Sequence, residues 1–236
     1  MTEFLFRDDA YLKSCSATVT AADERGIELD RTVFYPTGGG QPGDTGWLVL
    51  PDGRRLAIVD TRKGDGADRI LHIPAAGEAL PAPGTAVSAE LDWGRRHRLM
   101  RMHSCLHLLS AVMPFPVTGG QVSDGKGRLD FDIQDAGQLD KDAITRQLNE
   151  LVAGDHPLQA RWITDDELMS NPELVKTMSV KPPMGSGRVR LIEVSGLDLQ
   201  ACGGTHVRRT GEIGAVVVRK IESKGKQNRR VAVEFA

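Results

Sequence analysis

The sequence predicts an α+β protein: a small N-terminal β-barrel domain followed by an α/β sandwich with a largely antiparallel sheet. Three observations predict it. Short strand-like runs and turn residues fill the first 90 residues, one long helical pattern follows, and strand-like and helix-like stretches then mix. The change of pattern separates a β-barrel domain over residues 1–91 from a second domain over residues 92–236.

The first 90 residues contain seven short runs with the composition of β-strands, separated by clusters of glycine, proline and aspartate. Many short strands at this spacing are typical of a small barrel or sandwich. The runs are SATVTAAD, GIELDR, TVFY, GWLVL, RRLAIVD, DRILHI and TAVSAELD.

The stretch from Trp93 to Met113 has a helical pattern. Apolar residues recur there every three or four positions, which places them along one face of an α-helix. Pro114 and Pro116 follow and are expected to end the helix. The apolar positions are Leu99, Met102, Leu106, Leu109 and Met113.

The remaining chain alternates strands with two more helices. Strands are expected at VTGGQVS, RLDFDI, LQARWIT, VRLIEV, AVVVRKIES and RRVAVEF, and helices at LDKDAITRQLNELV and DDELMSNPELVKT. In the first of these helices, Ile144, Leu148 and Leu151 share one face. This order is typical of one layer of helices on a largely antiparallel sheet.

The composition excludes several classes of protein. With 236 residues, of which 40% are hydrophobic and 26% charged, the chain has the profile of a soluble globular protein. No apolar run approaches the roughly 18 residues of a membrane span, and the start MTEFLFRDDA carries acids where a signal peptide is basic and then apolar. We therefore expect a cytoplasmic protein with no membrane contact, whose three cysteines form no disulfide.

The net charge of -2 conceals a basic segment near the C-terminus. Eight arginines and lysines lie between Arg208 and Arg230 and are opposed only by Glu212 and Glu222, so this segment carries a charge of about +6. A second basic run, GRRHRLMR, precedes His103. Each run is either a solvated face or a surface that attracts phosphates, and the presence of both beside the motifs below favours an anionic partner.

Two histidines have the spacing of metal ligands. His103 and His107 lie four positions apart in the expected helix, so both imidazoles can point to one side. Ser104 stands where an H-E-x-x-H protease has its general base, which argues against that class. Cys105 points elsewhere on the helix and is expected to be a buried packing thiol.

A second pair repeats the interval nearly a hundred residues later. Cys202 and His206 are four positions apart, and Gly203 and Gly204 between them let the backbone approach an ion or substrate closely. Imidazole and thiolate ligands together indicate one zinc ion. Four protein ligands indicate a structural site, whereas ligands from a helix and a distant Gly-rich loop favour a cleft with a catalytic ion, and both remain open.

Three motifs carry a resemblance to a known family. His103-x-x-x-His107, the following Gly119-Gly120-Gln121 and the stretch SGLDLQACGGTH resemble the editing domain of alanyl-tRNA synthetases and the free-standing alanyl-tRNA editing (AlaX) proteins. FYPTGGGQPGDTG, residues 34–46, independently resembles the Gly-rich motif just before that domain. The resemblance spans nearly the whole chain and is to the medium-length free-standing type, which lacks the aminoacylation domain.

The resemblance implies trans-editing. The protein would deacylate mischarged Ser-tRNA(Ala), and Gly-tRNA(Ala) as a second substrate, by cleaving the aminoacyl ester at a zinc site. A pocket built for alanine cannot strongly reject an amino acid with one added hydroxyl, so a second site is needed to remove the error. The implied zinc ligands are His103, His107, Cys202 and His206, and the implied partner is mischarged tRNA(Ala).

Other site residues follow from the same resemblance. Gln121 falls where the family has a polar glutamine near the metal, and Thr205 could hydrogen-bond the serine hydroxyl; without the family, the first is a solvent-facing strand residue and the second caps a loop. The residues expected to bind tRNA or substrate are Gly38, Gly39, Gly40, Gln41, Gly43, Asp44, Gly203, Gly204, Arg229 and Arg230.

The loop GGGQPGDTG has two interpretations. It lacks the Lys-Ser/Thr ending of a P-loop and is not G-x-G-x-x-G before a helix, which argues against nucleotide binding. By itself it is a tight strand connection in which Asp44 closes a turn. Under the family resemblance, it lies beside the editing cleft and receives the acceptor end of tRNA.

Three functions therefore compete: a zinc-dependent deacylase of mischarged tRNA(Ala), a non-catalytic tRNA-binding protein that zinc stabilises, and a zinc hydrolase of small esters. A purely structural site has no use for Gln121 or the Gly-rich loop, and a small-ester enzyme has no use for the basic segment. These features favour the deacylase. The oligomeric state does not follow from the sequence.

Overall fold

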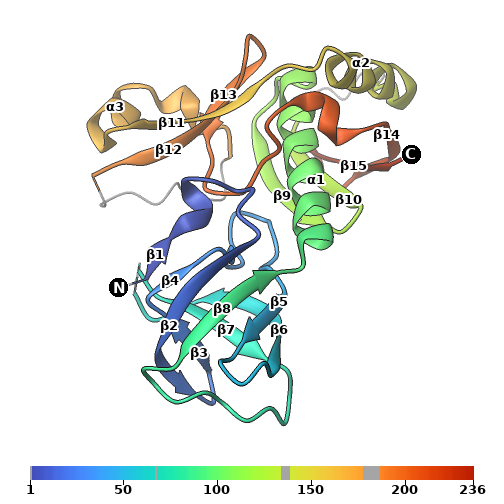
Figure 1. Cartoon of the computed structure of the whole chain (residues 1–236). Coiled ribbons are helices and arrows are strands. Elements are labelled where there is room, and N and C mark those ends of the chain that lie inside the picture. Colours follow the sequence, from blue (N-terminus) through green and yellow to red (C-terminus); the bar gives the residue numbers. More distant parts are fainter. Residues whose placement is uncertain (1, 67, 134–138, 178–186) are drawn as a thin grey trace. The chain divides into compact units, whose positions relative to one another are not determined.

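A computed structural model describes residues 2–66, 68–133, 139–177 and 187–236 (Figure 1). The strands are β1 (Glu3–Phe4), β2 (Ser14–Asp23), β3 (Gly26–Leu29), β4 (Arg31–Thr32), β5 (Gly46–Val49), β6 (Arg55–Lys63), β7 (Ile70–Pro74), β8 (Ala86–Leu91), β9 (Val117–Ser123), β10 (Lys126–Asp132), β11 (Leu158–Ile163), β12 (Val189–Val194), β13 (Asp198–Ala201), β14 (Val216–Ser223) and β15 (Asn228–Phe235). The α-helices are α1 (Trp93–Val112), α2 (Lys141–Ala153) and α3 (Asp165–Ser170), and short 3-10 turns are η1 (Leu5–Arg7), η2 (Pro172–Leu174) and η3 (Thr210–Ile213).

The chain divides into two compact units. The first comprises Met1–Gly38 and Pro42–His97, and the second comprises Gly39–Gln41 and Arg98–Ala236. The division thus falls inside helix α1, after His97, whereas the change of sequence pattern predicts a boundary after residue 91. Three residues of the Gly-rich loop belong to the second unit.

The first unit is a closed six-stranded barrel in the order β2-β3-β7-β6-β5-β8, with antiparallel neighbours throughout. Buried and less buried residues alternate along β5 and β8, as expected for strands with one face toward a core. Leu29, Leu48 and Leu56 are among its fully buried side chains. The predicted N-terminal β-barrel is confirmed.

The predicted strand TVFY was wrong beyond Thr32, where β4 ends. The next residues are buried, but their N–H groups bond to side chains and not to a strand. Phe34 N–H donates to Thr32 Oγ1 (3.0 Å), and Tyr35 N–H donates to Asp44 Oδ2 (2.6 Å). The β-branched and aromatic composition therefore reflects burial and not strand pairing.

The second unit contains a four-stranded sheet, β14-β15-β10-β9, and a three-stranded sheet, β11-β12-β13, both antiparallel. Helix α1 contacts the first sheet at Gly127 of β10, where a Cβ would lie 2.9 Å from Met102. In Figure 1 the three-stranded sheet is drawn to the left of α1, and α2 is drawn to the right of α1. The predicted α+β architecture with largely antiparallel sheets is confirmed.

The five apolar positions predicted along one face of this helix are all buried, at 0–4% exposure, although Met113 lies just beyond the end of α1 at Val112. The helix is buried on its other faces as well: Met100, Ser104 and Leu108 have no exposed surface. Cys105 is also fully buried, and burial raises the pKa of its thiol to about 12, as expected for a packing residue. No helix in the described ranges is long and apolar enough to cross a membrane.

The two shorter helices differ in detail from the prediction. In α2 the buried face is Ile144, Leu148 and Val152, so Val152 replaces the predicted Leu151. The second predicted helix is divided, since α3 ends at Ser170 and η2 begins at Pro172. Proline lacks an N–H and clashes with the preceding turn, which explains the break.

Candidate metal centre

The four predicted ligands converge at one point in the second unit. His103 and His107 lie one turn apart on α1, while Cys202 and His206 lie on the loop that follows β13. One donor atom from each of the four lies within 4.8 Å of the other three. Cys202 Sγ is 3.6 Å from His103 Nε2 and 3.3 Å from His206 Nε2. A tetrahedron with zinc–ligand distances of 2.0–2.3 Å has edges of roughly 3.3–3.8 Å, so these two separations and the types of the four donors fit such an ion.

In each of the three histidine ligands, Nδ1 is hydrogen-bonded to a different side chain outside the set of four ligands, here called an outer group. His103 Nδ1 lies 2.8 Å from Gln41 Oε1, and His206 Nδ1 lies 3.1 Å from Ser104 Oγ. His107 Nδ1 lies 3.1 Å from Asp198 Oδ2. Oxygen acceptors at Nδ1 fix the tautomer that leaves Nε2 free to bind a metal, and this is the usual outer arrangement of metal-bound histidines.

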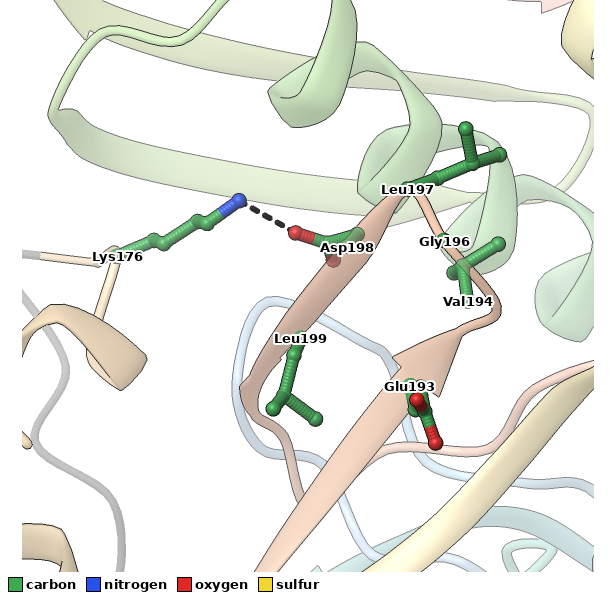
Figure 2. A pocket seen from close by; sticks show the side chains of 7 residues that line it. All are labelled: Lys176, Glu193, Val194, Gly196, Leu197, Asp198 and Leu199. Carbon is green, nitrogen blue, oxygen red and sulfur yellow. Dashed lines mark hydrogen bonds and ion pairs between the residues drawn. The ribbon is translucent and has the colours of Figure 1, made fainter.

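Asp198 is itself held by two further side chains. Its carboxylate accepts a hydrogen bond from Gln200 Nε2 (2.7 Å) and pairs with Lys176. Figure 2 shows Lys176 pointing at Asp198 on the wall of a cavity of about 290 Å³ beside the β12–β13 turn. Burial raises the pKa of Asp198, but the bonds from His107 and Lys176 outweigh it and lower that pKa to about 2. Asp198 is therefore a carboxylate at neutral pH.

The protonation states of the loop ligands also suit a metal. Burial raises the pKa of the Cys202 thiol, yet the neighbouring His103 and His206 lower it well below its usual value. Gly204 N–H adds a hydrogen bond to Sγ (3.4 Å). Burial lowers the pKa of His206 well below its usual value. A thiolate and a neutral imidazole are the forms that bind metal ions.

The Gly-rich loop reaches this centre through Gln41. The Gln41 side chain is 1% exposed; its Oε1 also accepts from Thr205 N–H (3.1 Å), and its Nε2 donates to Thr205 Oγ1 (2.8 Å). Gly40 places it there: at φ +80° it packs so closely on β9 that a Cβ would lie 2.7 Å from Gly120 O. Val122 N–H donates to Gly40 O (2.7 Å) and fixes the loop on that strand.

The two glycines between Cys202 and His206 have different surroundings. A Cβ on Gly204 would lie 2.2 Å from His103 Cε1, so this position requires glycine for the imidazole to approach. A Cβ on Gly203 would meet nothing within 4 Å. The expected close approach of backbone and site thus applies to Gly204, while the Gly203 Cα faces open space.

Comparison with known proteins extends over nearly the whole chain. Residues 189–232 match the family model of the threonyl and alanyl tRNA synthetase second additional domain, and residues 8–95 match that of the tRNA synthetases class II (A). The alanyl-tRNA editing protein AlaX-M of Saccharolobus solfataricus is 34% identical over 235 residues, 98% of each chain. AlaX-M of Methanosarcina barkeri is 36% identical over 241 residues, also 98% of each chain. The chain belongs to the AlaX family.

The same AlaX-family chain resembles part of a larger enzyme. The alanine–tRNA ligase of Methanothermobacter thermautotrophicus is 34% identical over 228 residues, which are 94% of this chain and 25% of the ligase. The family resemblance that the sequence motifs predicted is therefore confirmed.

The two predicted catalytic residues lie in different environments. Thr205 is 1% exposed and bonded to Gln41. Gln121 is exposed on β9, where its Oε1 accepts a hydrogen bond from Arg128 (3.3 Å) on the paired strand β10. The glutamines that contact a histidine of the metal centre are Gln41, at His103, and Gln200, at His107, and not the predicted Gln121.

The other predicted substrate-binding residues of the Gly-rich loop divide between the two units: Gly38, Gly43 and Asp44 belong to the barrel unit, and Gly39 and Gly40 to the second. Asp44 is 1% exposed, and its carboxylate accepts hydrogen bonds from Arg96 Nε and Tyr35 N–H, so it closes a turn as the loop by itself suggested. A Cβ on Gly43 would lie 2.1 Å from Thr61 O. Gly38 O accepts a hydrogen bond from the Tyr35 hydroxyl (2.8 Å). Gly39 adopts φ +56° and belongs to the second unit.

Much of the basic C-terminal segment is neutralised within the fold. Its ion pairs are Arg209 with Asp155, Arg219 with Glu234, Lys220 and Lys224 with Glu222, and Arg230 with Asp130. Arg230 and Arg128 share the carboxylate of Asp130, which is 8% exposed. Arg229 instead donates to the neutral oxygens of Ser223, Gly225 and Asn228.

Sequence reasoning missed the outer groups Ser104, Asp198 and Gln200, and Lys176 beside Asp198. One signal was present in the stretch DLQAC: Asp198 and Gln200 alternate just before Cys202, and a strand places such positions on one face. Their contact with His107 depends on where β13 lies against α1, which no local pattern gives. Gln41 was predicted as a substrate contact, whereas its observed partners are His103 and Thr205.

Proposed function

We propose that this protein is a trans-editing deacylase of mischarged tRNA(Ala), with Ser-tRNA(Ala) as its main substrate and Gly-tRNA(Ala) as a second. One observation carries the proposal: four donors of zinc-binding type converge within 4.8 Å in a chain that matches alanyl-tRNA editing proteins over 98% of its length. Its partner is tRNA(Ala) and its place of action is the cytoplasm, where that tRNA is charged.

The reaction is hydrolysis of an ester. Water adds to the carbonyl carbon of the aminoacyl group, the bond from that carbon to the ribose oxygen breaks, and the oxygen leaves with a proton to give free amino acid and tRNA. One zinc ion, when held by His103, His107, Cys202 and His206, supplies a Lewis acid for such a carbonyl or its attacking water.

The chain's own residues provide the geometry. Gln41 holds His103 and Thr205 together, so the ligand and the hydroxyl keep a fixed separation. Thr205 Oγ1 accepts from Gln41, which leaves its own proton to donate to the hydroxyl of a bound serine. Alanine lacks this hydroxyl, and a buried polar group left without its partner costs about 1–3 kcal/mol, enough to favour serine.

Two further residues are proposed to contact RNA. Gln121 is exposed on β9, the strand on which the Gly-rich loop lies, and we assign it to the nucleotide or water beside the ester. Arg229 is assigned to a phosphate, because its partners among the described residues are neutral oxygens and its charge is uncompensated there. Arg230 contributes less, since its guanidinium is held by the carboxylate of Asp130.

The test is release of serine from Ser-tRNA(Ala), with Ala-tRNA(Ala) as the control substrate. The intact protein is compared with Cys202→Ala, which removes a ligand, and with Cys15→Ala, which alters a cysteine of the barrel. Zinc content and folding are checked for each. We expect fast deserylation that spares alanine, persists in Cys15→Ala and collapses in Cys202→Ala.

Other outcomes support the competing functions. A folded, zinc-loaded protein that binds Ser-tRNA(Ala) without releasing serine is a non-catalytic tRNA-binding protein. Hydrolysis of simple amino-acid esters with no preference for the tRNA conjugate indicates a small-ester hydrolase.

A further inference from the structure

An exposed tryptophan lies on the edge strand β11. Trp162 is 42% exposed, and the three residues before it, Gln159, Ala160 and Arg161, are exposed as well. The guanidinium of Arg188 lies 5.5 Å from the centroid of its ring. Large exposed aromatic side chains are frequent at binding surfaces because one side chain offers a broad apolar area at low entropic cost.

Trp162 is aligned with the metal ligand Cys202 across the strands of the sheet. In the antiparallel pairing of β11 and β12, it lies directly opposite Arg190. Cys202 N–H, at the end of β13, donates to Arg190 O (3.1 Å), so the three residues occupy successive positions across adjacent strands. Neighbouring strands are about 4.8 Å apart, which separates the backbones of Trp162 and Cys202 by about 10 Å.

The indole also lies on the side of the sheet that faces the metal centre. Residues directly opposite in an antiparallel pair share a face, and so do alternate residues along a strand. Trp162 therefore shares a face with Arg190 and Ile192, and the partner of Ile192 is Gln200. Gln200 Nε2 lies 3.1 Å from His107 Nδ1, which places the metal ligands on this face.

Arg190 connects the two ends of this alignment. Its Nη1 donates to Cys202 O (3.1 Å) and Gly204 O (2.8 Å). Both oxygens belong to residues 202–206, the segment from one loop ligand to the other, here called the metal loop. The space from Trp162 to the metal loop is therefore bordered by two arginines, Arg188 and Arg190. A ligand that spans it meets an aromatic face and positive charge at one end and the metal centre at the other.

We propose that Trp162, flanked by Arg188, is a stacking platform for the nucleobase of the nucleoside whose ester the metal centre receives. This inference rests on the proposed function. In an aminoacylated nucleoside the base and the ester are separated by one ribose ring, which matches a platform two strands away from Cys202. Aromatic and guanidinium planes stack on unpaired bases whatever their identity, and a positive edge suits the adjoining phosphate.

The test compares two serine esters, one of adenosine and one of glycerol, which keeps neighbouring hydroxyls but has no base. We expect Trp162→Ala to lower kcat/KM for the adenosine ester about 10- to 100-fold, in the range of base–aromatic stacking, and to leave the glycerol ester unchanged. Trp162→Phe keeps an aromatic plane and restores most of the loss. Met169→Ala, at a residue of α3 that is 62% exposed, is the matched control.

A binding measurement separates this inference from the proposed function. The affinity of a short single-stranded RNA ending in adenosine is measured for the same variants, all with matched zinc content. If the protein hydrolyses neither these esters nor Ser-tRNA(Ala), the proposed function fails, and a 10- to 100-fold weaker RNA affinity of Trp162→Ala still supports the platform. Equal RNA affinity of Trp162→Ala and the parent protein overturns it, as does an equal loss on both esters.

Discussion

Gln41 and His103 are joined by a 2.8 Å hydrogen bond between Oε1 and Nδ1, although they lie 62 positions apart in the sequence. Because an amide oxygen only accepts, the bond places the imidazole proton on Nδ1 and leaves Nε2 to the metal. The same Oε1 accepts from Thr205 N–H, so one amide ties the Gly-rich loop to a helix ligand and to the metal loop.

Replacing Gln41 by alanine is expected to weaken zinc affinity about 10- to 100-fold, because the loss of a group that orients a metal-bound histidine has an effect of this size. The affinity is measured by competition with a chromogenic chelator. Gln121→Ala is the matched control, since Gln121 bonds to Arg128 and should leave zinc affinity unchanged. Equal affinities for the parent and Gln41→Ala would show that His103 is oriented without this bond.

The two glycines of the metal loop should respond differently to alanine. In Gly204→Ala the new Cβ would overlap the His103 ring, at 2.2 Å from Cε1, so we expect loss of zinc binding and of deacylation. Gly203→Ala meets nothing within 4 Å and should retain zinc. Zinc content by elemental analysis after dialysis checks both. Full zinc occupancy in Gly204→Ala would contradict the requirement for glycine at that position.

The barrel should lose stability in mild acid through His72. Its Nδ1 lies 2.9 Å from Ile27 O, and its Nε2 lies 2.8 Å from Thr32 Oγ1, so the neutral ring satisfies both partners. Burial lowers the pKa of His72 from 6.5 to about 4. As pH drops, the histidine of the unfolded chain is therefore protonated at a higher pH than that of the folded chain. The free energy of unfolding falls as pH drops from about 6.5 toward 4. Below pH 4 the total loss in the free energy of unfolding is about 3 kcal/mol, at 1.36 kcal/mol per pKa unit.

Urea unfolding at pH 7 and pH 5, followed by tryptophan fluorescence, checks this dependence. His72→Gln has no titrating ring, so the difference in unfolding free energy between the two pH values should be smaller than in the parent. An identical difference in both proteins would assign the acid sensitivity to other groups.

The adjacent arginines of β15 should have separate effects. Arg230→Ala removes one of the two partners of the buried Asp130 and is expected to lower the free energy of unfolding by about 1–2 kcal/mol. Arg229→Ala should change stability little, but reduce the salt dependence of tRNA affinity by the equivalent of about one phosphate contact. Urea unfolding and binding at several salt concentrations measure the two effects. An unchanged salt dependence in Arg229→Ala would remove its assignment to a phosphate.

The sequence by itself determined the features with a local cause. The barrel strands, the helix from Trp93 and the paired ligands follow from periodicity, turn residues and four-residue spacing, which operate over a few positions. The pair His103/His107 could be found because side chains four apart on a helix share a face, and Cys202/His206 because it repeats the interval with residues of the types that bind zinc.

Only the tertiary structure decided what each polar residue does. Whether Gln41 or Gln121 contacts His103 depends on the packing of Gly40 against β9, and the contact of Asp198 with His107 depends on where β13 lies against α1. The basic segment looked uncompensated because Asp130 and Asp155 come from distant parts of the chain and Glu234 lies just beyond Arg230. Contacts between distant segments are set by how whole elements pack, and no short pattern in the sequence encodes them.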